Sequence, residues 1–289
     1  MRRLAGIFAL FLLAGCGAVI SEGPGLILDR EGVVASEEAL AARLAAADVV
    51  VLGEVHDNPV HHARQARVVR ALGPAGVALE MVPEASEEGV QAFLAEGGAA
   101  GEIGPAIGWE RMGWPEWELY APIFEAAPGA YIAGGGVPRR QIRKALRAGA
   151  ATAYGPGASE IGLTRPLDPQ TRAEVEDEMI ASHCNALPRE VATGMVEAQR
   201  LRDARFARAV LRAREKGGGR VVLITGNGHA RTDRGVPVYL RALAPDLTIV
   251  SVGMIEFADQ DPSRLTGLPY DFVWVSRPHN RADPCEGFG

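Results

Sequence analysis

The stretch VVVLGEVHDNP, residues 49–59, decides the fold. Its first four residues, Val49 to Leu52, form a β-branched apolar run, which predicts a strand that is buried on both faces. Asn58 followed by Pro59 is typical of a helix start, because Asn caps free N–H groups and Pro suits the first helical position. We therefore predict a strand that passes directly into a helix over residues 59–72, as in an α/β sheet.

The same alternation continues along the chain. Further strands are predicted over residues 76–80, 130–134, 220–225, 247–256 and 272–275, and helices over residues 84–96, 138–149, 168–182 and 188–216. Apolar strands alternating with helices predict an α/β fold, with a mostly parallel sheet, helices on both faces and a helical insertion. We expect a single α/β domain over residues 26–280, with the helical insertion within residues 84–215, and a C-terminal tail over residues 281–289.

The first residues have the pattern of an export signal. Arg2 and Arg3 precede an unbroken apolar run over residues 4–13, and small residues follow it. A signal peptide has this order of charge, apolar stretch and cleavage site. The apolar run is shorter than the ~20 residues that span a bilayer, so a permanent transmembrane helix is not expected there.

The sequence LAGC, residues 13–16, resembles a lipobox. It predicts a lipoprotein signal peptide over residues 1–15, lipidation of Cys16 and a lipidated tether over residues 16–25. A core helix that happens to end in Cys is the alternative. Gly17 stands where Asp would favour retention in the inner membrane. We therefore expect a cell-envelope protein, lipid-anchored to the outer membrane and facing the periplasm.

Charge and cysteine content narrow the class of protein further. The 289 residues carry a formal net charge of −6, so they show no basic footprint for nucleic acid. If Cys16 carries lipid, Cys184 and Cys285 are the cysteines that remain. An even pair in an oxidising compartment predicts one disulfide, which would tie the C-terminal tail to the middle of the chain. Two free buried thiols are the alternative.

Polar residues follow three of the predicted strands. They are Glu54 and His56 after the first, Glu80 at the end of the second, and Asn227, His229 and Arg231 after the fourth. Ligands bind at the carboxyl ends of parallel strands. Glu54 and His56 are two residues apart, so they point to one face if the strand continues. Each residue alone suits a structural role, but together they predict a functional site.

An aromatic segment provides a second feature. Three of the four tryptophans lie within residues 108–117, and Trp117, Tyr120 and Phe124 follow at helical spacing. An amphipathic helix that packs on its own core gives this pattern. An apolar flap over a flat hydrophobic ligand gives it equally well.

Several short motifs together resemble the ChaN-like haem-binding lipoproteins. They are GEVHDNP at residues 53–59 with His61 and His62, ALEM at 78–81, GWP at 113–115 with Tyr120, Gln199 with Arg202 and Asp203, and GNGHAR at 226–231. The resemblance covers roughly residues 45–255. It places the chain in a larger group with erythromycin esterases and the TIKI metalloproteases, which share the Gly-x-x-His motif, an acidic strand end and a late Gly-x-His. Gly134-Gly135-Gly136 departs from the more polar stretch expected there.

The resemblance implies an iron-linked surface lipoprotein that binds haem at a homodimer interface with tyrosine ligation. Tyr120 and Tyr154 are the candidates for that tyrosine. The other ligand-binding candidates are His62, Arg202, Asp203, Asn227 and Arg231.

Two functions of different classes follow. The first is a membrane-anchored extracytoplasmic haem-binding lipoprotein linked to iron or haem uptake, with haem as cofactor and no nucleic-acid partner. The alternative is a divalent-metal-dependent or general-base hydrolase whose catalytic residues are Glu54, His56, Glu80 and His229. In it Glu54 is the expected base, Arg231 stabilises an oxyanion, and the metal ligands are His56, His229 and Glu80. An envelope protein with a vestigial site is a third interpretation. The resemblance favours haem binding.

Overall fold

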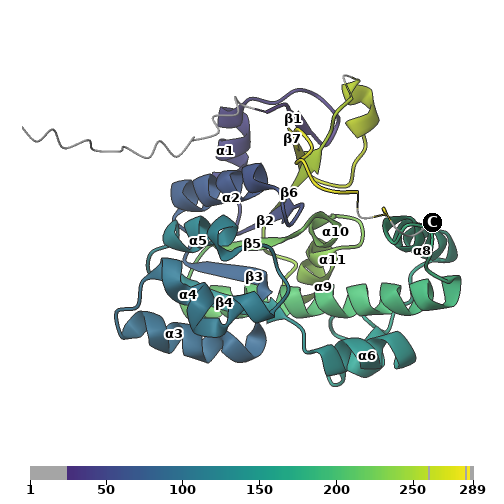
Figure 1. The fold of residues 1–289 in the computed structure, drawn as a ribbon, viewed down its shortest axis with the longest axis horizontal. Helices are drawn as coiled ribbons and strands as arrows, with labels where there is room; N and C mark the ends of the chain where they lie inside the picture. Colours follow the sequence, from purple (N-terminus) through teal and green to yellow (C-terminus); the bar gives the residue numbers. More distant parts are fainter. Residues whose placement is uncertain (1–24, 260, 284, 287–289) are drawn as a thin grey trace, which may run out of the picture.

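A seven-stranded sheet forms the centre of this structure, a computed structural model that describes residues 25–259, 261–283 and 285–286 (Figure 1). The strands are β1 (Ile27–Asp29), β2 (Val49–Glu54), β3 (Gly76–Pro83), β4 (Tyr131–Gly136), β5 (Val221–Gly226), β6 (Ile249–Glu256) and β7 (Phe272–Ser276). Their spatial order is β1-β7-β6-β2-β5-β3-β4, and every neighbouring pair is parallel except β1 with β7. The predicted α/β fold with a mostly parallel sheet is confirmed.

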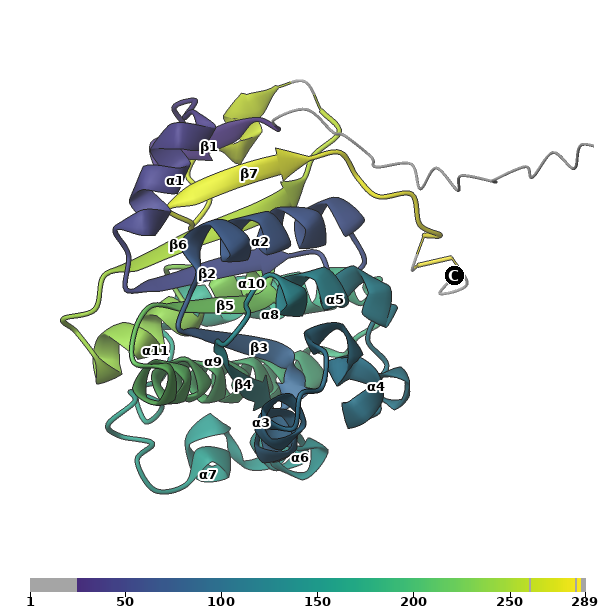
Figure 2. The same ribbon diagram turned by 90° about the vertical axis from the view of Figure 1, so that its left-hand side faces the viewer.

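Helices cover both faces of the sheet (Figure 2). One core gathers side chains of α1 (Glu37–Ala45), α2 (Pro59–Leu72), α3 (Glu87–Ala95), α4 (Ile103–Ile107) and α5 (Trp117–Glu125). The other gathers those of α6 (Arg139–Ala148), α7 (Ala150–Tyr154), α9 (Arg189–Gly217), α10 (Asn227–Ala230) and α11 (Val236–Leu243), while α8 (Pro169–Ser182) packs on α9. Val50 and Leu52 enter the first core and Val49 and Val51 the second, which explains the continuous apolar run.

The start of α2 follows the predicted capping chemistry. The side chain of Asn58 accepts hydrogen bonds from the N–H groups of Val60 and His61, and Pro59 is the first helical residue. Gly73 ends the helix with a φ of 50°, a left-handed conformation that glycine adopts without strain. These two end signals set the helix at the predicted bounds.

Two elements differ from the prediction in their bounds. The helix predicted over residues 84–96 is α3, and a 3₁₀ turn, Glu84–Ser86, precedes it. The strand predicted over residues 130–134 continues to Gly136, so the triple glycine forms the last half of β4. A Cβ on Gly134 would lie 2.5 Å from the carbonyl oxygen of Pro83, so β4 can approach the irregular end of β3 only with glycine.

The predicted disulfide is present between Cys184 and Cys285, 101 residues apart. Cys184 lies in the turn between α8 and α9, and Cys285 lies in the C-terminal tail. In the part of the chain that the structure describes, no helix is long and apolar enough to cross a bilayer. Cys16, the expected lipidation site, lies outside the described residues.

Candidate functional site

The end of β2 forms the first half of the candidate site. Glu54 is buried, and its Oε1 accepts hydrogen bonds from the Tyr120 hydroxyl at 2.8 Å and from Nδ1 of His56 at 2.7 Å. Nδ1 of His62 lies 3.5 Å from the other oxygen of Glu54. Nε2 of His62 donates to the backbone carbonyl of His56 at 2.9 Å. One carboxylate therefore organises side chains from α2, from α5 and from the turn after β2.

The ends of β3 and β5 form the second half. Oε2 of Glu80 accepts hydrogen bonds from the Thr225 hydroxyl at 2.7 Å and from the N–H of Gly226 at 2.8 Å. Its Oε1 lies 3.6 Å from Nε2 of His229, whose Nδ1 lies 2.6 Å from the carboxylate of Asp203 on α9. The imidazole of His229 is thus held between two carboxylates, an arrangement that fixes its orientation.

The two halves of the site meet at Gly226, where a side chain would lie against residues of both halves. A Cβ there would lie 3.1 Å from Nε2 of His56 and 3.7 Å from Oε2 of Glu80. His56 lies with its ring edge-on to Trp114, 5.0 Å between centroids, and its side chain is 35% exposed. We call Glu54, His56, His62, Glu80, Asp203 and His229 the strand-end cluster. His56 is its most exposed member.

Burial and neighbouring charges shift the pKa values of the side chains in the strand-end cluster. Burial opposes protonation of the two imidazoles, but the adjacent carboxylates outweigh it and raise the pKa of His56 and of His229. Burial opposes ionisation of Glu80, but the charges of His229 and His56 outweigh it and lower the pKa of that carboxyl. Burial raises the pKa of Asp203 to about 6, against the attraction of His229. Such shifts suit a site that takes up or releases protons near neutral pH.

Glu54 and His56 meet by a different route from the expected one. β2 ends at Glu54, and His56 lies in the turn that precedes α2. The turn is closed by the N–H of Asn58, which donates to the carbonyl of Val55 at 3.0 Å. A turn, rather than a continued strand, brings the two side chains together.

The two candidate tyrosines lie in different surroundings. Tyr120 is fully buried and donates to Glu54, and burial together with that carboxylate holds the pKa of its phenol far above the ordinary value. Tyr154 ends α7, outside the strand-end cluster. Nε of Arg208 donates to its hydroxyl at 3.1 Å, and the guanidinium of Arg205 lies 4.5 Å from its ring centroid.

Three further ligand-binding candidates were predicted from the sequence, and only one of them lies beside the strand-end cluster. Arg202 bonds to Gln199 at 2.6 Å beside the Asp203–His229 pair. Arg231 turns to Asp233 instead, with contacts of 2.6 and 3.0 Å. The side-chain amide of Asn227 donates to the backbone carbonyl of Met254 and accepts from its N–H, so it joins the start of α10 to β6.

Most of the aromatic segment is core. Trp109 is buried against Trp117 and Tyr120, with ring centroids 5.0 and 4.8 Å away, and its indole N–H donates to the carbonyl of Pro115. The indole N–H of Trp117 donates to Gly101. The helix-packing interpretation is therefore the one that the structure shows for these two tryptophans.

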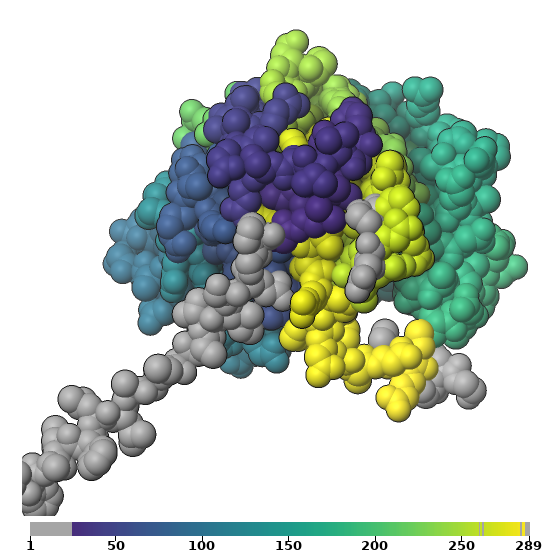
Figure 3. All heavy atoms as spheres, turned by 90° about the horizontal axis from the view of Figure 1, so that it is seen from above, coloured from purple at the N-terminus to yellow at the C-terminus, as the bar shows by residue number. Residues whose placement is uncertain are grey.

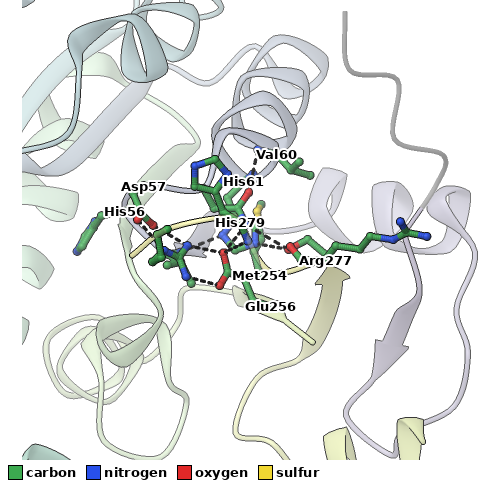
Figure 4. A network of polar contacts seen from close by, with 12 residues as sticks. His56, Asp57, Val60, His61, Met254, Glu256, Arg277 and His279 are labelled. Atoms are coloured by element: carbon green, nitrogen blue, oxygen red, sulfur yellow. Dashed lines mark hydrogen bonds and ion pairs between the residues drawn. The ribbon is translucent and has the colours of Figure 1, made fainter. Parts of the chain in front are cut away.

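Sequence reasoning missed the polar network beside the cluster (Figure 4). His61 is fully buried. Its Nδ1 accepts from the N–H of Val55 at 2.9 Å, and its Nε2 donates to Ser276 at 2.9 Å. Arg281 of the tail contacts Asp57 and Glu256. No sequence signal pairs Arg281 with Asp57, because 224 residues separate them.

The geometry gives no support to the divalent-metal alternative. Among residues 25–259, 261–283 and 285–286, no group of three His, Cys, Asp or Glu side chains is placed to hold a metal ion. The side chains of His56, His229 and Glu80 instead form hydrogen bonds and ion pairs with other residues or with each other.

A small cavity of about 80 Å³ adjoins Asp203 between α8, α9 and α10.

Comparison with known proteins identifies the family. No curated protein matches the chain. Among solved structures, ChaN of Campylobacter jejuni, described by its cofacial heme binding, is 22% identical, with a TM-score of 0.64 over 86% of this chain and 95% of that one. Erythromycin esterase EreC in its open conformation is 14% identical, with a TM-score of 0.42 over 91% of this chain and 86% of that one. The family model described as haem-binding uptake, Tiki superfamily, ChaN matches residues 40–240, and the chain belongs to that family.

Proposed function

We propose that the chain is a membrane-anchored extracytoplasmic lipoprotein that binds haem and serves iron or haem uptake. The family match over residues 40–240 carries the proposal, because that family is one of haem-binding uptake proteins. The likeness to the Campylobacter jejuni protein, at 22% identity, supports the fold alone. Haem binding by this chain is tested by titration of the purified protein with haemin.

The donor set suits haem better at Tyr154 than at Tyr120. Tyrosine ligates haem iron as an anion, and bound haem would supply an iron that a tyrosine oxygen could hold. The guanidinium of Arg208 donates to the Tyr154 hydroxyl and could compensate a charge on that oxygen, while the Arg205 guanidinium lies over the ring. Tyr120 faces a carboxylate, which disfavours its anion. We therefore propose that Tyr154 would hold the haem iron.

Matched tyrosine variants test this assignment. In haemin titrations, Tyr154→Phe should lose the absorption bands of tyrosine-ligated iron, and Tyr120→Phe should keep them. The reverse result would place the ligand on Tyr120. Retention of the bands in both variants would remove tyrosine ligation from the proposal. Sedimentation with and without haemin tests the homodimer, which should form in proportion to bound haem.

The anchor is tested separately from the ligand. Cys16 would carry the lipid, and residues 16–25 would tether the domain at β1, an edge strand of the sheet. Cys16→Ala should move the protein from the membrane fraction to the soluble periplasmic fraction, because a lipid chain supplies the anchoring free energy. A variant that still pellets with outer membranes contradicts the lipoprotein assignment.

A second candidate function, a metal-independent hydrolase, rests on one observation. Two carboxylate–imidazole units meet over Gly226, and one imidazole, His56, reaches the surface. Since Glu54 is buried under two hydrogen bonds, it suits the orientation of His56 better than the role of base. His56 would take a proton from water as the water oxygen attacks an ester carbonyl, and would return that proton to the leaving alkoxide.

Ester hydrolysis in the presence of a chelator tests this candidate. A p-nitrophenyl ester should be hydrolysed by the wild type, with loss in His56→Gln and in Glu80→Gln. His279→Gln, which changes an exposed imidazole, is the matched control. Equal rates in His56→Gln and the control would exclude an acid–base role for His56.

A further inference from the structure

An apolar groove lies between α1 and α2, and its lining residues are all outside the strand-end cluster. Its volume is about 320 Å³, within the range of about 300–1,000 Å³ that is typical of small-molecule sites. Leu40 and Leu44 of α1, Leu72 of α2 and Trp274 of β7 line it. The residues of α1, in purple, lie at the surface of the face seen from above (Figure 3).

Small side chains keep this groove open. Leu40, Ala41, Leu44 and Ala45 recur at the spacing of one helix face, which usually packs against a neighbouring element. Leu40 and Leu44 are buried, but Ala41, Ala45 and Ala71 of α2 are exposed although they line the groove. The methyl groups of these alanines do not fill the space between the two helices. Apolar surface therefore stays accessible there.

An ion pair joins the two helices at the charged residues of the lining. Nη2 of Arg67 on α2 lies 3.1 Å from Oε1 of Glu37 on α1, and the two side chains are 55% and 35% exposed. The guanidinium of Arg67 also lies 5.1 Å from the ring centroid of Trp274. An exposed ion pair of this kind contributes little to stability. Arg67 can therefore exchange Glu37 for an oxygen of a bound ligand.

The described part of the chain begins beside this groove. A Cβ on Gly25 would meet the guanidinium of Arg64 on α2, and that guanidinium lies 4.7 Å from the ring centroid of Trp274. Cys16 is nine residues before Gly25, and nine residues span at most about 30 Å. A lipid on Cys16, or the bilayer that holds it, would thus lie within reach of the groove.

We propose that the groove between α1 and α2 binds a fatty acyl chain, whose carboxyl or ester oxygen contacts Arg67. The apolar lining buries the methylenes, and the guanidinium favours a head group that carries oxygen. The chain comes either from the lipid on Cys16 or from a lipid of the membrane. The choice of these two sources rests on the proposed lipid anchor, whereas the fit of an acyl chain to the groove does not.

Calorimetric titration with fatty acids below their micellar concentrations tests the proposal on the folded, unlipidated Cys16→Ala protein. Decanoate should bind saturably, with one molecule per chain. Because each buried methylene raises the affinity about fourfold, decanoate should bind about 15-fold more tightly than octanoate. A titration without saturable binding, or an affinity that does not depend on chain length, overturns the proposal.

Filling the groove should remove the site. In the Cys16→Ala protein, Ala41→Phe places a ring in the groove and should weaken decanoate binding about tenfold or more. Ala42→Phe, which is exposed on the same helix but outside the lining, is the matched control and should bind decanoate as the parent does. Ala71→Phe and its control Ala63→Phe repeat the comparison on α2, in case Ala41→Phe does not fold. Equal affinities in each variant and its control overturn the proposal.

The head group is tested by the two members of the ion pair. Arg67→Gln should weaken decanoate binding about two- to fivefold and leave the binding of uncharged 1-decanol unchanged. Glu37→Gln removes the competing carboxylate, so it should strengthen decanoate binding by a similar factor. Unchanged decanoate affinity in both variants contradicts the contact with Arg67.

A photoactivatable fatty acid supplied to cells identifies the source of the chain. A crosslink to α1 or α2 from the lipid on Cys16 assigns the anchor as the source. A crosslink from a phospholipid that persists in Cys16→Ala assigns the bilayer. No crosslink to either helix in both proteins contradicts an acyl site. Failure of the lipoprotein proposal alone is distinguishable, because the wild type then carries no lipid while decanoate binding remains.

Discussion

His61 should make the folded protein sensitive to mild acid. Its two ring nitrogens have assigned roles: Nδ1 accepts from the backbone N–H of Val55, and Nε2 donates to Ser276. The ring is fully buried and must stay neutral to accept that first bond. Burial, followed by the charge of Arg64, lowers the pKa of His61 to about 3.

The magnitude follows from proton linkage. Because the pKa of His61 is depressed in the folded state, the unfolded chain binds the proton first as pH falls below about 6.5, and the folded state loses stability. The contribution is fully present above that pH and is lost progressively as pH falls toward 3. Between pH 7 and pH 5 the expected loss from this residue is about 2 kcal/mol.

A comparison of variants isolates this effect from other titrating groups. Urea unfolding at pH 7 and pH 5 gives the free energy of unfolding of wild type, His61→Gln and the exposed control His279→Gln. At pH 7 the free energy of unfolding of His61→Gln should be about 1–3 kcal/mol below that of the wild type, because the buried partners of His61 lose their hydrogen bonds. Its deficit should shrink by about 2 kcal/mol at pH 5. If the difference in unfolding free energy between His61→Gln and wild type is the same at pH 7 and pH 5, the imidazole of His61 is not held neutral in the folded state.

Three further substitutions test packing, each measured by urea unfolding with the exposed Val33→Ala as a control expected to change stability by less than about 0.5 kcal/mol. Tyr120→Phe removes a donor from a buried carboxylate and should cost about 1–3 kcal/mol; a neutral result would contradict that bond. Trp109→Ala should cost about 3–5 kcal/mol, and a smaller cost would place its ring outside the core. Gly53→Ala places a Cβ 2.4 Å from Oδ1 of Asn227 and should cost about 1–3 kcal/mol; unchanged stability would contradict that close approach.

Local signals were sufficient for much of the fold. The apolar run from Val49 and the Asn58–Pro59 pair determine a strand and a helix within a dozen residues of each other, so α2 has its predicted bounds. β1 escaped notice because three residues form no pattern. α1 escaped although Ser36 caps it and acidic residues follow, because its alanines make the apolar stripe weak.

The candidate site was predictable only where the topology decides it. Parallel strands end at one edge, so Glu54, Glu80 and His229 had to be neighbours there. Which side chain partners which depends on tertiary packing. Asp203 reaches His229 from the middle of a long helix, and Arg281 reaches Asp57 from the tail. Neither pairing has a local sequence cause.

The strand-end cluster and Tyr154, the proposed haem ligand, have different contacts in this fold. The cluster is a compact set of hydrogen-bonded acids and imidazoles, whereas Tyr154 lies among arginines of α9. Loss of the cluster through Glu80→Gln should therefore leave haem binding in place, and loss of haem binding should leave the cluster intact. Each proposal can fail without the other.

Equilibrium titration of the purified protein with haemin tests most directly whether the chain binds haem through Tyr154. A saturable shift of the Soret band with a defined stoichiometry is expected, and it should be lost in Tyr154→Phe. A linear, non-saturating increase in absorbance, equal in wild type and in Tyr154→Phe, would contradict it.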